Sequence, residues 1–187
     1  MIDRSPAFCR IGGLSGFISL WHFPSRKNLE QASSLGCSAV VTLQGLAEDP
    51  NVAMIKMTCL ELGLDWVQID FWKHYYQHTG SEGHPGLISL VNNIAIKVAK
   101  GDKVLIHCAA GIHRTGMCVY AVLRKLGFSP GDTLECIRQI RRVTFERCGG
   151  RRFSEMESHI KQWFPDILRI QSGPHFVPDP GSGVVHI

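Results

Sequence analysis

Short apolar segments alternate with longer amphipathic segments along most of this chain, and that alternation restricts its fold more than any other feature. The predicted strands cover residues 16–21, 37–43, 65–70 and 103–107. The predicted helices cover residues 25–35, 50–62, 85–100, 114–126, 129–142 and 154–164. Alternating strands and helices are typical of α/β domains built on a parallel sheet. We therefore expect an α/β fold with a central, mainly parallel sheet flanked by helices.

The length of the chain fits one domain. It has 187 residues, of which 44% are hydrophobic and 19% charged, and this globular composition excludes a disordered, highly charged protein. We expect the domain to span residues 1–170, followed by a Gly/Pro-rich tail at residues 171–187. Residues 71–84 are predicted to form a surface loop, because their second half is rich in glycine.

Seven cysteines are spread along the chain, an odd number with no C-x-x-C pair. This pattern argues against a disulfide framework and a zinc ribbon, so we expect a reduced protein in the cytoplasm. The first residues lack the apolar core of a signal peptide, and no run of eighteen apolar residues could span a membrane. The net charge of +4 is too small to argue for a nucleic-acid partner, although it does not exclude one.

The most informative segment is HCAAGIHRTG, residues 107–116, between a predicted strand and a predicted helix. The first N–H groups of a helix lack partners within it, and the helix dipole adds partial positive charge there. A turn at Gly111 can direct further N–H groups inward, and the Arg114 guanidinium can bind two oxygens of a phosphate. The segment therefore predicts a phosphate-binding loop. Its residues are His107, Cys108, Ala109, Ala110, Gly111, Ile112, His113 and Arg114.

Cys108 lies at the end of the predicted strand, beneath this loop. The positive field that binds phosphate also favours thiolate over thiol, which makes Cys108 a candidate nucleophile toward phosphorus. The hydroxyl of Thr115 can donate a hydrogen bond to the sulfur and help it leave when a phosphocysteine is hydrolysed. The alternative is that Cys108 is a small buried hydrophobe and Arg114 a solvated helix residue. The combination C-x5-R-T-G at a strand–loop–helix junction favours the phosphate-binding interpretation.

The segment HCAAGIHRTG resembles the signature loop of the cysteine-dependent phosphatase superfamily, which includes tyrosine and dual-specificity protein phosphatases. It matches H-C-x5-R-[ST]-G at every defining position, and a weaker resemblance to the small dual-specificity members covers residues 16–165. The resemblance implies that Cys108 is the nucleophile, that Arg114 binds the phosphoryl group and that Thr115 assists thiolate departure. It also implies that His107 holds the loop and Cys108 by hydrogen bonds, and that the reaction needs neither a metal nor another cofactor.

The leaving oxygen of a phosphate ester needs a proton, which members of this family usually take from an Asp on another loop. Asp65, Asp70 and Asp102 are the candidates near enough in sequence. Sites in parallel sheets form at the carboxyl ends of strands, and among these three only Asp70 ends a predicted strand. A right-handed crossover through residues 85–100 would bring the Asp70 loop beside the Cys108 loop. We therefore expect Asp70 to be the general acid, with a turn or helix-cap carboxylate as the alternative.

We predict a phosphoprotein phosphatase that hydrolyses phosphotyrosine through a phosphocysteine intermediate, and also phosphoserine or phosphothreonine if it has dual specificity. Its expected partner is a phosphorylated protein. The phosphoinositide-directed branch of the family carries lysines at the positions of Ala109 and Ile112, so their absence argues against an inositol-lipid substrate. The alternatives are an RNA 5′-triphosphatase of the same superfamily and a catalytically silent phospho-binding module.

Three further groups of side chains have open roles. A cluster of arginines could dock an acidic substrate or form a solvated helix face, and it comprises Arg138, Arg141, Arg142, Arg147, Arg151 and Arg152. The aromatic residues Trp72, Tyr75 and Tyr76 could stack on a phosphotyrosine ring or pack their own segment onto the domain. His74 and His78 have the i, i+4 spacing of a metal-binding pair, but no carboxylate or cysteine pattern completes a site.

Overall fold

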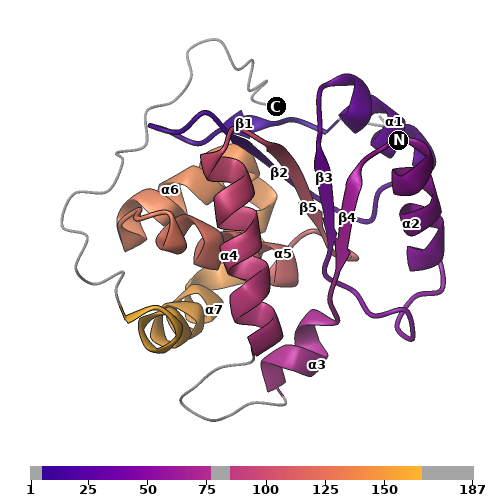
Figure 1. The fold of residues 1–187 in the computed structure, drawn as a ribbon. Helices are drawn as coiled ribbons and strands as arrows, with labels where there is room; N and C mark the ends of the chain where they lie inside the picture. The colour runs from indigo at the N-terminus through magenta and orange to yellow at the C-terminus, as the bar shows by residue number, and fades with distance from the viewer. Residues whose placement is uncertain (1–5, 77–84, 166–187) are drawn as a thin grey trace.

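A five-stranded sheet with the strand order β1-β2-β5-β3-β4 forms the centre of the computed structural model, which describes residues 6–76 and 85–165 (Figure 1). The strands are β1 (Cys9–Arg10), β2 (Phe17–Trp21), β3 (Ala39–Thr42), β4 (Asp65–Gln68) and β5 (Lys103–His107). The neighbouring pairs among β2, β5, β3 and β4 are parallel, whereas β1 pairs antiparallel with β2. The predicted α/β fold with a mainly parallel sheet is thus confirmed. β1 was not predicted, because two residues are too few to show an alternating pattern.

Helices cover both faces of this sheet (Figure 1). One face carries α1 (Arg26–Ser34) and α2 (Val52–Glu61), and the other carries α4 (Pro85–Ala99), α5 (His113–Lys125), α6 (Pro130–Ile140) and α7 (Arg142–Trp163). Successive strand residues alternate between the two faces: Val41 and Ile106 belong to the core beneath α4 and α5, and Val40 and Leu105 to the core beneath α1 and α2. Because both faces are covered, the central strands β3 and β5 are mostly apolar.

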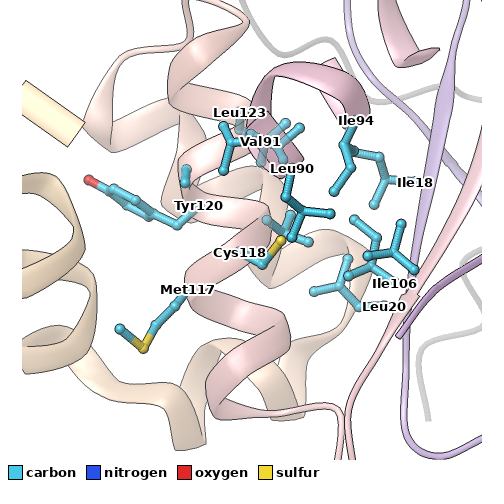
Figure 2. Close-up of a cluster of buried hydrophobic side chains, with 14 of the residues drawn as sticks. Ile18, Leu20, Leu90, Val91, Ile94, Ile106, Met117, Cys118, Tyr120 and Leu123 are labelled. Carbon is cyan, nitrogen blue, oxygen red and sulfur yellow. The ribbon is translucent and has the colours of Figure 1, made fainter. Parts of the chain in front are cut away.

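The larger core fixes α5 against the sheet (Figure 2). Leu20 of β2 and Ile106 of β5 share this buried cluster with Leu90 and Ile94 of α4 and Cys118 of α5, and none of the five is more than 4% exposed. Burying an aliphatic side chain of this size contributes about 1.5–3 kcal/mol. The same packing therefore determines the position of the loop that enters α5.

Two segments differ from their predicted structure. The predicted loop at residues 71–84 begins with a short helix, α3 (Phe71–Tyr76), because its aromatic side chains pack on one another: Phe71 is 2% exposed and stacks on Tyr75 at 5.7 Å. Residues 77–84 lie outside the described part, as does the predicted tail at 171–187. The last helix, predicted from residue 154, begins at Arg142 and is interrupted at Gly149, where φ is 79° and ψ is 153°. The Gly149-Gly150 pair interrupts the helical periodicity of the sequence, so the part of α7 before it was not predicted as belonging to this helix.

Candidate active site

The segment 107–116 joins β5 to α5 at the carboxyl edge of the sheet, as predicted. Ile112 precedes the first turn of α5, and its side chain makes no capping hydrogen bond. Within the described residues, no backbone N–H group of residues 109–115 donates to another backbone atom, whereas that of Gly116 donates to Ile112 O at 2.8 Å. These N–H groups and the positive end of the α5 dipole can bind an anion.

Cys108 directly follows β5 and is 3% exposed. Thr115, in the first turn of α5, is wholly buried, and its hydroxyl has no hydrogen-bond partner among the residues that the structure describes. The hydroxyl is therefore an unengaged donor, and its hydrogen bond to the Cys108 sulfur stays a prediction. All seven cysteines are buried, and none forms a disulfide bond within residues 6–76 and 85–165.

The guanidinium of Arg114 is held by hydrogen bonds from one of its three nitrogens, Nη1. Its Nη1 donates to Leu43 O at 3.3 Å and to Glu48 Oε2 at 2.5 Å, and the residue is only 7% exposed. Across residues 6–76 and 85–165, no hydrogen bond is found for its Nε and Nη2. Because the guanidinium is a rigid planar fork, fixing Nη1 orients Nε and Nη2 toward a common acceptor group, such as two phosphoryl oxygens.

Glu48 was not among the residues singled out from the sequence. It lies in the segment after β3 and is 66 positions away from Arg114, so no local spacing connects them. A signal was nevertheless present, because Glu48 follows a buried strand at the same sheet edge that was used to choose Asp70. Applied to every strand, that argument would have included Glu48.

His107 links the start of the loop to the two strands beyond it. Its Nε2 lies 2.8 Å from Thr42 Oγ1 of β3, which also accepts a hydrogen bond from Trp66 Nε1 of β4 at 3.0 Å. Burial lowers the pKa of His107 to about 3, so the imidazole is neutral near pH 7. The Thr42 hydroxyl that accepts from Trp66 keeps both its own hydrogen and a second lone pair, so the tautomer of His107 decides which of the two groups donates in the bond to Nε2. As a neutral side chain, His107 thus ties the end of β5 to β3, and its predicted hydrogen bonds to the loop and to Cys108 stay a prediction.

The middle of the loop is held by residues at the start of α7. Gly111 O accepts hydrogen bonds from Arg141 Nη1 at 2.5 Å and from Thr144 Oγ1 at 2.7 Å, and Arg141 Nη1 also lies 3.3 Å from Ala110 O. Gly111 has a φ of +67°, and a Cβ there would lie 2.2 Å from Trp21 O. The loop can therefore approach β2 this closely only with glycine at this position.

Asp70 follows β4 and is half-buried. Its Oδ1 accepts a hydrogen bond from Lys73 N at 3.2 Å, which is the helix-cap contact considered as its alternative role. A Cβ built on Gly45 would lie 2.6 Å from Asp70 Oδ2, so the carboxylate packs against the segment that also carries Glu48. The crossover argument was wrong in one respect. β3 lies between β4 and β5, so these two strands are not neighbours, and the segment after β3 connects the two sites: its Gly45 packs against Asp70 and its Glu48 bonds Arg114.

The arginine cluster divides into residues with different surroundings. Arg138, Arg142 and Arg151 form ion pairs with glutamates three or four residues away, and such exposed pairs add little to stability. Arg141 contacts the loop, and burial lowers its pKa. Arg147 and Arg152 have no ion pair or hydrogen bond from their guanidinium groups within the part of the chain that the structure describes.

Among the described residues, no group of three His, Cys, Asp or Glu side chains could hold a metal ion, and His78, four residues after His74, lies outside the described residues. None of the described helices is both long enough and apolar enough to cross a lipid bilayer.

The sheet, its two helical layers and the loop after β5 define a protein-tyrosine-phosphatase-like fold. A family model described as "Tyrosine phosphatase family" matches residues 33–135. The chain therefore belongs to this family of cysteine-dependent phosphatases. A search of curated proteins gave no significant match.

Solved structures of small phosphatases share the fold. The kinase-associated phosphatase, crystallised with its catalytic-site cysteine changed to serine, is 14% identical with a TM-score of 0.67, over 86% of this chain and 97% of the other. Tk-PTP in its active form is 22% identical with a TM-score of 0.60, over 84% and 97%. The catalytic core of the PP-IP phosphatase Siw14 from S. cerevisiae is 21% identical with a TM-score of 0.53, over 89% and 92%.

Proposed function

We propose that this chain is a protein phosphatase that hydrolyses phosphotyrosine through a phosphocysteine intermediate. One observation carries the proposal: the loop that begins at buried Cys108 has N–H groups without a backbone acceptor among the described residues, and it ends at Arg114, whose Nη1 is held by Glu48. A dianionic phosphoryl group suits such donors, because its oxygens accept hydrogen bonds and its charge is opposite to that of the guanidinium and of the helix N-terminus.

In the first step, the thiolate of Cys108 attacks phosphorus, an S–P bond forms and the P–O bond to the leaving group breaks. Asp70 gives its proton to the leaving oxygen, while the loop N–H groups and Arg114 stabilise charge on the phosphoryl oxygens. In the second step, water attacks the phosphocysteine, Asp70 takes the proton from water and the S–P bond breaks. Thr115 donates a hydrogen bond to the departing sulfur. The products are inorganic phosphate and the original thiolate.

Aromatic side chains after Asp70 support a phosphotyrosine substrate over a phosphoserine substrate. Tyr75 packs onto α7, with its ring 5.2 Å from that of His159. Trp72 and Tyr76 stack on each other at 5.3 Å, and Tyr76 is 67% exposed. The segment thus combines an anchoring residue with an exposed aromatic surface, on which a second ring could stack.

The test is phosphate release by wild-type protein from four substrates: a phosphotyrosine peptide, a phosphoserine peptide, RNA with a 5′-triphosphate and an inositol pyrophosphate. We expect turnover of the phosphotyrosine peptide to be the fastest. Cys108→Ser should abolish hydrolysis but still bind the peptide, and Asp70→Asn should lower kcat much more than binding. Release from RNA or inositol pyrophosphate alone would refute the proposed substrate. A wild-type protein that binds the peptide but hydrolyses nothing would instead be a phospho-binding module.

A further inference from the structure

A cavity of about 400 Å³ lies between α3 and α7, and none of the loop residues 107–116 lines it. Its walls include Trp72 and Tyr76 of α3, Met117 of α5, and Arg152, Glu155 and His159 of α7. The α3 wall is aromatic, whereas the α7 wall carries charged groups. A ligand that fits both walls has an apolar surface on one side and a charged group on the other.

The cavity is close to the phosphate-binding loop. Met117 is four residues, about 6 Å along the helix axis, beyond His113, the first residue of α5. Figure 2 shows that Met117 points away from the core side chains Leu20 and Ile106 on the sheet. The first part of α7 packs against the same turn of α5, because Cys148 Sγ lies 3.8 Å from His113 O. Arg152, four residues beyond Cys148, lines the cavity next to this contact.

The charges of the cavity favour an anionic ligand. Glu155 is already paired with Arg151, whose Nε lies 2.9 Å from Glu155 Oε1. Arg152 is only half-exposed, and its guanidinium has no acceptor within residues 6–76 and 85–165. A partly desolvated guanidinium without an acceptor gains from a carboxylate or phosphate more than an exposed, paired one does.

We infer that this cavity is a subsite for an anionic group that flanks the phosphotyrosine of the substrate, with Arg152 as its binding residue and the aromatic wall of Trp72 and Tyr76 against the phosphotyrosine ring beside it. The inference rests on the proposed function. The anionic group is either the carboxylate of an acidic residue or a second phosphate on the same peptide, because both present oxygens to the guanidinium fork.

The test measures kcat/KM for three phosphotyrosine peptides that differ at one flanking position: glutamate, phosphoserine or glutamine. We expect wild-type protein to prefer both acidic peptides. Arg152→Ala should lower kcat/KM for these two about tenfold, as expected for one lost charge-assisted hydrogen bond, and leave the glutamine peptide within twofold. The relative loss for glutamate and phosphoserine then identifies the source of the anion.

Two more variants separate binding from folding. Arg142→Ala removes a paired, 80% exposed arginine from the same helix and should change none of the three values. Arg152→Glu should reverse the preference in favour of a lysine-flanked peptide, a gain that misfolding cannot produce. If Arg152→Ala affects all three peptides equally, or none of them, the subsite is refuted while phosphotyrosine hydrolysis stands. If wild-type protein hydrolyses no phosphotyrosine peptide, the proposed function fails, and the subsite fails with it.

Discussion

Gly111→Ala tests how closely activity depends on the approach of the loop to β2. The added Cβ would lie 2.2 Å from Trp21 O, so reaching even a tight contact of 3.2 Å requires a movement of about 1 Å. A displacement of about 1 Å at reacting groups can lower the rate roughly a hundredfold. The positive φ of +67° adds about 1–2 kcal/mol of backbone strain. We therefore expect kcat/KM for p-nitrophenyl phosphate to fall about a hundredfold in a protein that still folds.

Gly63→Ala is the matched control. Gly63 also has a φ of +67°, but no atom lies within 4 Å of its added Cβ and it is far from the loop in sequence. This variant should show only the backbone strain, as a lower urea midpoint with unchanged kcat/KM. If Gly111→Ala retains kcat/KM within threefold of Gly63→Ala, the loop accommodates a methyl group without moving and the reasoning from the close approach is refuted.

Three other changes have distinct readouts. Glu48→Gln should raise KM for p-nitrophenyl phosphate about fivefold, because Arg114 loses the carboxylate that fixes Nη1. This factor corresponds to a loss of about 1 kcal/mol of interaction energy, as for a partly exposed ion pair. An unchanged KM would contradict the role of Glu48. Gly149→Ala should lower the free energy of unfolding by about 1–3 kcal/mol, because its φ of 79° and ψ of 153° suit only glycine; an unchanged urea midpoint would show that the helix break adapts. The pKa of His107 is about 3 in the folded protein, below its value in the unfolded chain. Protonation of His107 therefore does not reduce the free energy of unfolding above about pH 6.5. As the pH falls from there toward 3, the free energy of unfolding decreases by up to about 1.4 kcal/mol per pH unit. The free energy of unfolding in urea should therefore change less between pH 7 and pH 5 for His107→Gln than for wild type. Equal changes in the two proteins would show that burial does not lower the pKa of His107.

The elements that the sequence predicts well are those with local causes. Ser25 and Ser129 cap α1 and α6: each side-chain oxygen accepts a hydrogen bond from the backbone N–H three residues on, and both serines stand where the helices were predicted to begin. The loop at residues 107–116 was likewise found from a contiguous motif. In each case, the residues that cause the structure are neighbours in the chain.

The parts that were missed depend on contacts between distant segments. Glu48 reaches Arg114 across 66 positions, and Thr144 reaches Gly111 across 33. The strand order, with β3 between β4 and β5, is likewise not determined by the order of elements along the chain. This is why the surroundings of Asp70 were only partly predicted from the sequence.

The position of α7 determines how small a working fragment of this protein can be. The family match ends at residue 135, and a fragment ending there would still contain Cys108 and Arg114. Such a fragment would lose Thr144, which binds the loop, as well as Phe153, which stacks on Tyr120 of α5 at 5.4 Å. Expression boundaries chosen from the family match alone would therefore remove the outer support of the loop, and the shortest useful fragment extends through α7.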